Sequence, residues 1–153
     1  MSGAEDSCFV CRKHRGELRM PGGNLYEDDL VCASHGELPD GKTHTYPGVL
    51  FVEPRRHVPG MAGLTRAEAE RVGLVASRLA RALETCAGAE HTYLAVLGHH
   101  VSHLHVWIVP RYPGTPPDVF GLDVLRWPDR PRADVTELEQ LCGRLRQHLA
   151  DEG

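Results

Sequence analysis

The sequence predicts an α+β fold, and three observations support this class. Residues 93–97 and 104–109 are apolar runs of strand length, separated by a segment that begins Gly98-His99-His100, so we expect a central antiparallel pair of strands. A long amphipathic helix precedes this pair, and a second helix ends the chain. With 153 residues, 41% of them apolar and 25% charged, the chain has the size and balance of a single domain over residues 1–153.

Three short strands and the long helix are expected first. The strands are predicted at residues 25–26, 30–33 and 49–52, and Pro54 closes the last of them. The polar segment 34–47 contains glycines and prolines, which favours a loop that lines a site. For the helix, Thr65 with Glu68 forms a capping-box pattern, and Gly88 lies at or beyond its end. Its apolar stripe consists of Val72, Val75, Leu79 and Leu83.

The C-terminal part is predicted as a loop and a helix. Residues 110–133 are rich in proline, and they should form an ordered loop because they carry apolar side chains that a disordered linker would not need. These side chains are Phe120, Leu122, Leu125 and Trp127. The helix is expected over residues 134–150, with Asp134 or Thr136 as its cap. Its apolar stripe consists of Leu138, Leu141, Leu145 and Leu149.

Composition excludes several classes of partner. The net charge is −4 and no Lys/Arg-rich run occurs, which argues against a nucleic-acid-coating surface. Residues 1–8 are polar and acidic, unlike a signal peptide, and no apolar run approaches the ~20 residues that cross a bilayer. We therefore expect a cytoplasmic protein with no nucleic-acid and no membrane partner. A small anionic substrate stays compatible with this charge, since a local patch can oppose the net charge.

Four histidines fall within seven residues, in a chain that has ten. Side chains two apart on a strand share a face, so His103, His105 and Trp107 should point together at a cleft or a partner, with the two histidines roughly 7 Å apart. A polar ring in an apolar strand needs a reason, which favours a functional role for His103 and His105. His99 and His100 lie at an expected turn, where a solvated surface fits as well as a functional role.

Cys8 and Cys11 form a C-x-x-C pair near the N-terminus. The chain has five cysteines, an odd number, and a reducing compartment is expected, so metal ligation is favoured over a disulfide framework. A closed tetrahedral zinc site needs two more ligands, usually histidines from distant parts of the chain. A plain structural or oxidisable C-x-x-C pair is the alternative.

Residues 98–111 resemble the signature of the histidine triad family, His-x-His-x-His flanked by apolar residues and followed by Pro-Arg. The order of elements is also similar to that of the bacterial members over residues 8–112. The shared features are the C-x-x-C pair, Tyr26-Glu27-Asp28, a strand ending in Pro54-Arg55-Arg56-His57, the long helix and the histidine strand. The resemblance implies an antiparallel sheet of about five strands that carries the long helix, with the last helix beside it, and a two-fold homodimer.

The resemblance also assigns roles to individual residues. The middle histidine is the nucleophile in the family and corresponds to His105, whose other ring nitrogen would be oriented by a backbone carbonyl. Structural Zn²⁺ would be held as in the zinc-containing triad proteins and the related galactose-1-phosphate uridylyltransferases. The corresponding ligands here are Cys8, Cys11, His57 and His103.

Several positions depart from the family pattern. Trp107 replaces the third histidine, which the uridylyltransferases also lack. His99 and His100 replace the Gln and the Ser or Thr that contact the phosphate in the family, and we expect them to bind the phosphate or to donate the proton. The sugar-binding segment has no Asp counterpart near His35. The expected substrate contacts are therefore His35, Trp107 and Arg111, although a surface ion pair would suit Arg111 equally.

Three functions fit these residues. The first is a nucleotide hydrolase or nucleotidyl transferase with a covalent phosphohistidine intermediate on His105. The second is an enzyme of another class that re-uses the histidine cluster on a non-nucleotide metabolite. The third is a zinc-stabilised nucleotide-binding module without catalysis. The altered phosphate and sugar contacts favour the second and third, whereas retention of His105 at the nucleophile position favours the first. Resemblance of fold alone cannot choose between them.

Overall fold

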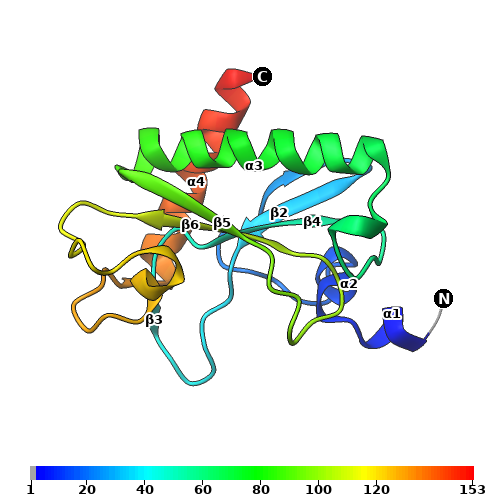
Figure 1. The fold of residues 1–153 in the computed structure, drawn as a ribbon, viewed down its shortest axis with the longest axis horizontal. Helices are drawn as coiled ribbons and strands as arrows, with labels where there is room; N and C mark the ends of the chain where they lie inside the picture. Colours follow the sequence, from blue (N-terminus) through cyan, green and yellow to red (C-terminus); the bar gives the residue numbers. More distant parts are fainter. Residues whose placement is uncertain (1–2) are drawn as a thin grey trace.

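Five antiparallel strands form the central sheet of the computed structural model, which describes residues 3–153 (Figure 1). In sheet order they are β1 (Asn24–Glu27), β2 (Val31–His35), β4 (Leu50–Pro54), β6 (Val106–Arg111) and β5 (His91–Ala95). Every neighbouring pair is antiparallel. The predicted five-stranded sheet is confirmed, as is the pairing of the two strands around the histidine segment.

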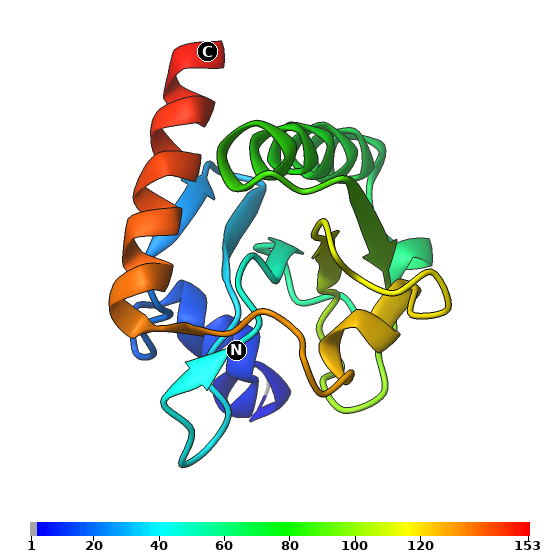
Figure 2. The ribbon, with the colours of Figure 1, turned by 90° about the vertical axis from the view of Figure 1, so that its left-hand side faces the viewer.

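Two long helices complete this part of the fold, as predicted. Figure 1 shows α3 (Arg66–Ala87) lying along one face of the sheet, and Figure 2 shows α4 (Val135–Glu152) beside it. The capping box of α3 forms, because Thr65 and Glu68 each accept a hydrogen bond from the other's backbone N–H. Gly88 ends α3 in the left-handed conformation with φ of 73°. Asp134 caps α4 in the same way.

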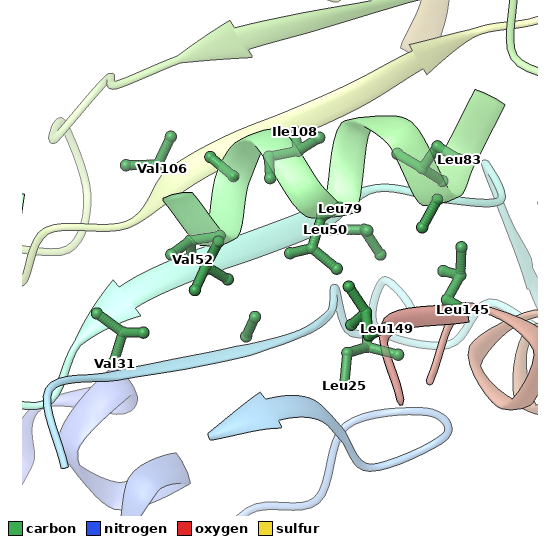
Figure 3. Packing of buried hydrophobic residues seen from close by; sticks show 14 of the residues in the cluster. Leu25, Val31, Leu50, Val52, Leu79, Leu83, Val106, Ile108, Leu145 and Leu149 are labelled. Carbon is green, nitrogen blue, oxygen red and sulfur yellow. The ribbon is translucent and has the colours of Figure 1, made fainter. Parts of the chain in front are cut away.

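The main core lies between the sheet and these helices (Figure 3). It includes Leu50 and Val52 of β4, Val106 and Ile108 of β6, Leu79 and Leu83 of α3, and Leu145 and Leu149 of α4. Because strand side chains alternate, the residues between these core positions point to the opposite face. Phe51, Glu53 and Trp107 therefore face away from α3, and that face is available for a site.

The proline-rich segment between β6 and α4 is ordered, as predicted. It contains a short 3₁₀ helix, η2 (Gly121–Leu125), and ends in β7 (Ala133–Asp134), which pairs with β3 (His44–Thr45). Val124 is fully buried in a second apolar cluster with Tyr46, Val49 and Val109, and Leu122 and Leu125 pack against this cluster. Phe120, however, is 64% exposed and does not anchor the loop.

The structure corrects two local predictions. Segment 34–47 is not a loop throughout, because β2 continues to pair with β4 as far as His35, opposite Leu50. The pairing of β3 with β7 joins segments distant in the chain, which a local pattern does not reveal. The predicted strand 104–109 is β6, which begins only at Val106, so His103 and His105 precede it instead of lying on it.

Two short helices, α1 (Gly3–Ser7) and α2 (Phe9–His14), form at the N-terminus. They lie on the side of the sheet away from α3 (Figure 1). Cys8 is the N-cap of α2, so the C-x-x-C pair occupies the first turn of a helix. Within residues 3–153, every helix is too short or too polar to cross a bilayer.

Candidate functional site

Four potential metal ligands meet where α2 approaches the sheet. Cys8 and Cys11 come from the first turn of α2, His57 follows β4, and His103 precedes β6. One ligand atom from each residue lies within 4.8 Å of the other three. The structure thus brings together all four residues that the sequence predicted as zinc ligands.

The distances within this cluster fit a tetrahedral ion. His103 Nδ1 lies 3.6 Å from Cys8 Sγ and 3.4 Å from Cys11 Sγ. His57 Nδ1 lies 3.5 Å from Cys11 Sγ. Zn–S and Zn–N bonds of about 2.3 and 2.0 Å place ligand atoms roughly 3.3–3.8 Å apart around a tetrahedron. Two thiolates and two imidazoles are also a preferred donor set for zinc, so the cluster is a structural zinc site.

A backbone hydrogen bond orients the ring of His103 for metal binding. Its Nε2 donates a hydrogen bond to the carbonyl oxygen of Pro54 at 2.7 Å, which leaves the Nδ1 lone pair directed at the sulfurs. The residue is fully buried, and this burial lowers the pKa of His103 to about 4. A neutral ring is the form that binds a metal. With four protein ligands, the site is closed and leaves no position for a substrate.

His105 lies two residues further along and borders a cavity instead. Its Nδ1 lies 2.8 Å from the carbonyl oxygen of His103. Because a carbonyl can only accept, Nδ1 carries the proton and Nε2 keeps its lone pair. No described residue forms a hydrogen bond with Nε2. The backbone of one metal ligand therefore orients the imidazole of His105 and leaves its second nitrogen free.

The cavity has a volume of about 1220 Å³ and lies on the sheet face opposite α3. Phe51 and Trp107 form an aromatic wall beside His105, with centroid distances of 4.7 Å between Phe51 and Trp107 and 5.9 Å between Phe51 and His105. Trp107 Nε1 is buried without a hydrogen-bond partner among the described residues. The indole thus contributes a wall and no acidic proton.

His99 and His100 line the same cavity from the segment between β5 and β6. Both side chains are exposed, and their rings lie edge to face with centroids 4.7 Å apart. Together with His105, they make three imidazoles of the histidine segment that line this cavity, alongside His35 and His44. This proximity is what the dense histidine segment predicted.

The other two expected substrate contacts have different surroundings. His35 lines the cavity, but its ring is buried, and Nδ1 donates to the Gly36 carbonyl while Nε2 accepts from the Gly48 N–H. Arg111 lies outside the cavity lining. Its guanidinium pairs with Glu90 at 2.8 Å and donates to backbone carbonyls of the proline-rich segment, those of Thr115, Pro116 and Val119. Of the two alternatives for Arg111, the structure shows the ion pair.

Sequence reasoning missed a buried ionic group at this site. Lys13 Nζ lies 2.5 Å from Glu53 Oε1, and His14 Nε2 lies 2.9 Å from Glu53 Oε2. Burial raises the pKa of Glu53, but the hydrogen bond from His14 and the charge of Lys13 together hold it below its usual value. Both Lys13 and Glu53 line the cavity. The one signal in the sequence was a carboxylate at the end of an apolar strand, directly before Pro54.

The fold and the site together define a protein with a closed Cys2His2 metal site and a free imidazole on one face of an antiparallel sheet. The family model of the HIT domain matches residues 18–114, and the chain belongs to this histidine triad family. The match includes His57, His103 and His105, whereas Cys8 and Cys11 precede it. No curated protein sequence matches the chain.

Solved structures of this family share the fold. A zinc-bound histidine triad family protein from Mycobacterium smegmatis is 22% identical, with a TM-score of 0.70 over 97% of this chain and 96% of that one. A Hit-like protein from Bartonella henselae is 20% identical, with a TM-score of 0.69 over 94% and 97% of the two chains. A hypothetical histidine triad nucleotide-binding protein from Sulfolobus tokodaii is 21% identical, with a TM-score of 0.67 over 94% and 93%. Family membership supports a nucleotide-binding or nucleotide-hydrolase type of function in general terms.

Proposed function

We propose that this protein is a nucleotide hydrolase or nucleotidyl transferase in which His105 is the nucleophile. The hydrogen bond between His105 Nδ1 and the His103 carbonyl carries the proposal, because it leaves the lone pair of Nε2 available. A neutral imidazole is nucleophilic near pH 7 without a strong base. The structural zinc, held by Cys8, Cys11, His57 and His103, fixes the segment that supplies this carbonyl and takes no part in the reaction.

The reaction proceeds in two steps. The Nε2 lone pair attacks phosphorus, so that a P–N bond forms while the bond to the leaving group breaks and its electron pair departs with the leaving group. Water or another acceptor then attacks phosphorus, the P–N bond breaks, and neutral His105 is regenerated as the acceptor loses its proton. A leaving group of high pKa needs a proton in the first step.

Trp107 occupies the position from which the third histidine of the family would act, and its indole is not an acid. His99 and His100 border the same cavity and are the proposed source of the proton or of the phosphate contacts. Trp107 and the ring of His35 form walls for the substrate. Arg111 acts from a distance by holding the proline-rich segment in place.

The protein is proposed to act as a homodimer. β5 is an edge strand of the sheet. Leu94 of β5 and Leu74 of α3 are each 54% exposed, and α3 contacts β5. A second copy would cover these apolar side chains. Light scattering should therefore give twice the chain mass, and Leu94→Glu should give the mass of one chain.

The variant His105→Asn tests the reaction. It removes the nucleophile and keeps a polar side chain, so turnover of a responsive nucleotide should fall by several orders of magnitude while substrate affinity and zinc content are retained. His91→Asn, an exposed histidine on β5 outside the cavity lining, is the matched control and should keep full turnover. Near-normal turnover by His105→Asn would instead favour the enzyme of another class. A tight ligand that is never turned over would favour the binding module.

A further inference from the structure

A wall of the cavity comes from outside the matched family domain. The HIT domain match ends at residue 114, yet Leu125, Arg130 and Arg132 line the cavity. Figure 2 shows the orange end of this segment passing beside β3 before it enters α4. The pairing of β3 with β7 fastens it there, with His44 opposite Asp134 and Thr45 opposite Ala133. This wall is therefore a built part of the site.

The cationic side chains on this wall have no carboxylate partner among the described residues. Arg130 donates only to the Trp127 carbonyl at 3.0 Å, and Arg132 only to the Pro128 carbonyl at 3.3 Å. Lys42 lines the same cavity from the β2–β3 loop and is likewise without an ion pair in residues 3–153. Arg111, the last residue of β6, does pair with a carboxylate, Glu90. Arg111 is thus neutralised by an ion pair, whereas the two arginines that line the cavity, Arg130 and Arg132, have no such partner among the described residues.

Cationic side chains outnumber carboxylates in the cavity lining, although the chain carries a net charge of −4. Of the two carboxylates that line it, Glu53 is neutralised by Lys13, and only Glu37 opposes the three unpaired cations. A local field of this kind concentrates anions at the site. Two guanidinium groups two residues apart are also well suited to phosphate, because each can donate two parallel hydrogen bonds to it.

The size of the cavity leaves room for more than one anionic group. A drug-sized ligand occupies a pocket of about 300–1,000 Å³. The volume here, about 1220 Å³, exceeds that range. The cavity therefore has room for a second anionic group in addition to the phosphate at His105 and its substituent.

We propose that Arg130 and Arg132, with Lys42 from the β2–β3 loop that lines the same cavity, form a second anion subsite that binds a further phosphate group besides the one that His105 attacks. The inference deepens the proposed function and rests on it for the identity of the first phosphate. The substrate class is then one with at least two phosphates. The second phosphate either belongs to the same molecule or is a free phosphate that serves as acceptor.

Binding of inorganic phosphates tests the subsite without any need for turnover. The His105→Asn protein is titrated calorimetrically with phosphate, pyrophosphate and tripolyphosphate at fixed ionic strength. Tripolyphosphate should bind at least ~10-fold more tightly than phosphate. Its length allows one molecule to contact both the phosphate position beside residue 105 and the proposed subsite. The double change Arg130→Gln/Arg132→Gln should abolish this preference, and Arg132→Lys should weaken it while keeping the charge.

The matched control is Arg126→Gln, an exposed arginine of the same segment that does not line the cavity. It should keep the preference, and all variants should keep the parental melting temperature. Equal affinity for the three anions, or an equal loss in Arg126→Gln, would overturn the subsite. Two phosphate ions bound per chain, one of them lost in the double variant, would identify free phosphate as its source.

The two proposals fail separately. Turnover that survives His105→Asn, together with a preference for tripolyphosphate, would leave the subsite standing and remove the covalent reaction. Turnover that needs His105, without any such preference, would remove the subsite alone.

Discussion

His103 and His105 lie two residues apart in opposite surroundings. His103 is fully buried, and both ring nitrogens have partners, the Pro54 carbonyl on one side and the cysteine sulfurs on the other. His105 is half-buried, and only Nδ1 has a partner. The closed zinc side and the open cavity side thus share one stretch of backbone. The metal-site imidazole therefore uses both of its nitrogens, whereas the imidazole at the cavity keeps one nitrogen free.

Removing the metal should have the largest effect, because the zinc side depends on all four ligands. Cys8→Ser should abolish the one zinc per chain and greatly lower the melting temperature, since structural zinc contributes about 10–16 kcal/mol of apparent binding free energy in small zinc domains. Metal analysis and thermal melting check this. Cys86→Ser, a partly exposed cysteine outside the cluster, is the control and should change neither quantity. Protein purified without chelators that contains no zinc would contradict the closed site.

Lys13 lies between the two surroundings, because its pair with Glu53 is buried yet borders the open cavity. Lys13→Met leaves a buried carboxylate without its ammonium partner, so the free energy of unfolding should fall by about 3–5 kcal/mol. Urea unfolding measures this loss. The exposed pair of Arg12 and Glu17 is the control, and Arg12→Gln should cost less than about 1 kcal/mol. Equal effects of the two changes would show that burial does not distinguish these pairs.

His99 and His100 test what the open side uses in place of the third histidine. If either donates the proton, its change to Ala should lower turnover by roughly 10²-fold for poor leaving groups and much less for good ones. Rates for a series of leaving groups of different pKa check this. An equal loss across the series would indicate phosphate binding, and no loss would leave both residues as surface histidines.

The pair of Glu68 and Arg56 connects α3 to the segment that carries the zinc ligand His57. The Glu68 carboxylate accepts a hydrogen bond from Arg56, the neighbour of His57, and this bond lowers the pKa of Glu68 to about 2. An unfolded Glu has a pKa of about 4.3, so the stabilisation is complete above that pH and is lost as the pH falls through 2. Glu68→Gln removes the charge that pairs with Arg56, whose side chain is half exposed, so it should cost about 1 kcal/mol of unfolding free energy at pH 7. Urea unfolding from pH 7 to pH 2 should show the two proteins converging, and a constant difference would contradict the assignment.

Local signals predicted much of the fold and two of the four metal ligands, Cys8 and Cys11. The capping boxes at Thr65 and Asp134 mark helix starts because their hydrogen bonds join residues only three apart in the sequence. The Cys8–Cys11 spacing and the clustered histidines were similarly local. Two later ligands, His57 and His103, came only from the family resemblance, since spacing cannot show which distant histidines meet the cysteines.

Contacts between distant segments could not be predicted in this way. The ion pair of Lys13 and Glu53 joins α2 to β4, and neither residue belongs to a periodic pattern. The β3–β7 pairing, which brings the proline-rich segment to the cavity, involves only two residues in each strand. Such short pairings have no sequence signature, because their stability comes from the packing around them.

His105 is proposed to form a covalent bond to phosphorus during turnover. Intact mass spectrometry after brief exposure to a panel of nucleotides and rapid denaturation tests it most directly. The account predicts an added mass equal to one nucleotidyl group, located at His105 by peptide fragmentation and absent from His105→Asn. Covalent catalysis by His105 would be contradicted if a nucleotide is turned over while the protein never gains this mass or gains it at another residue.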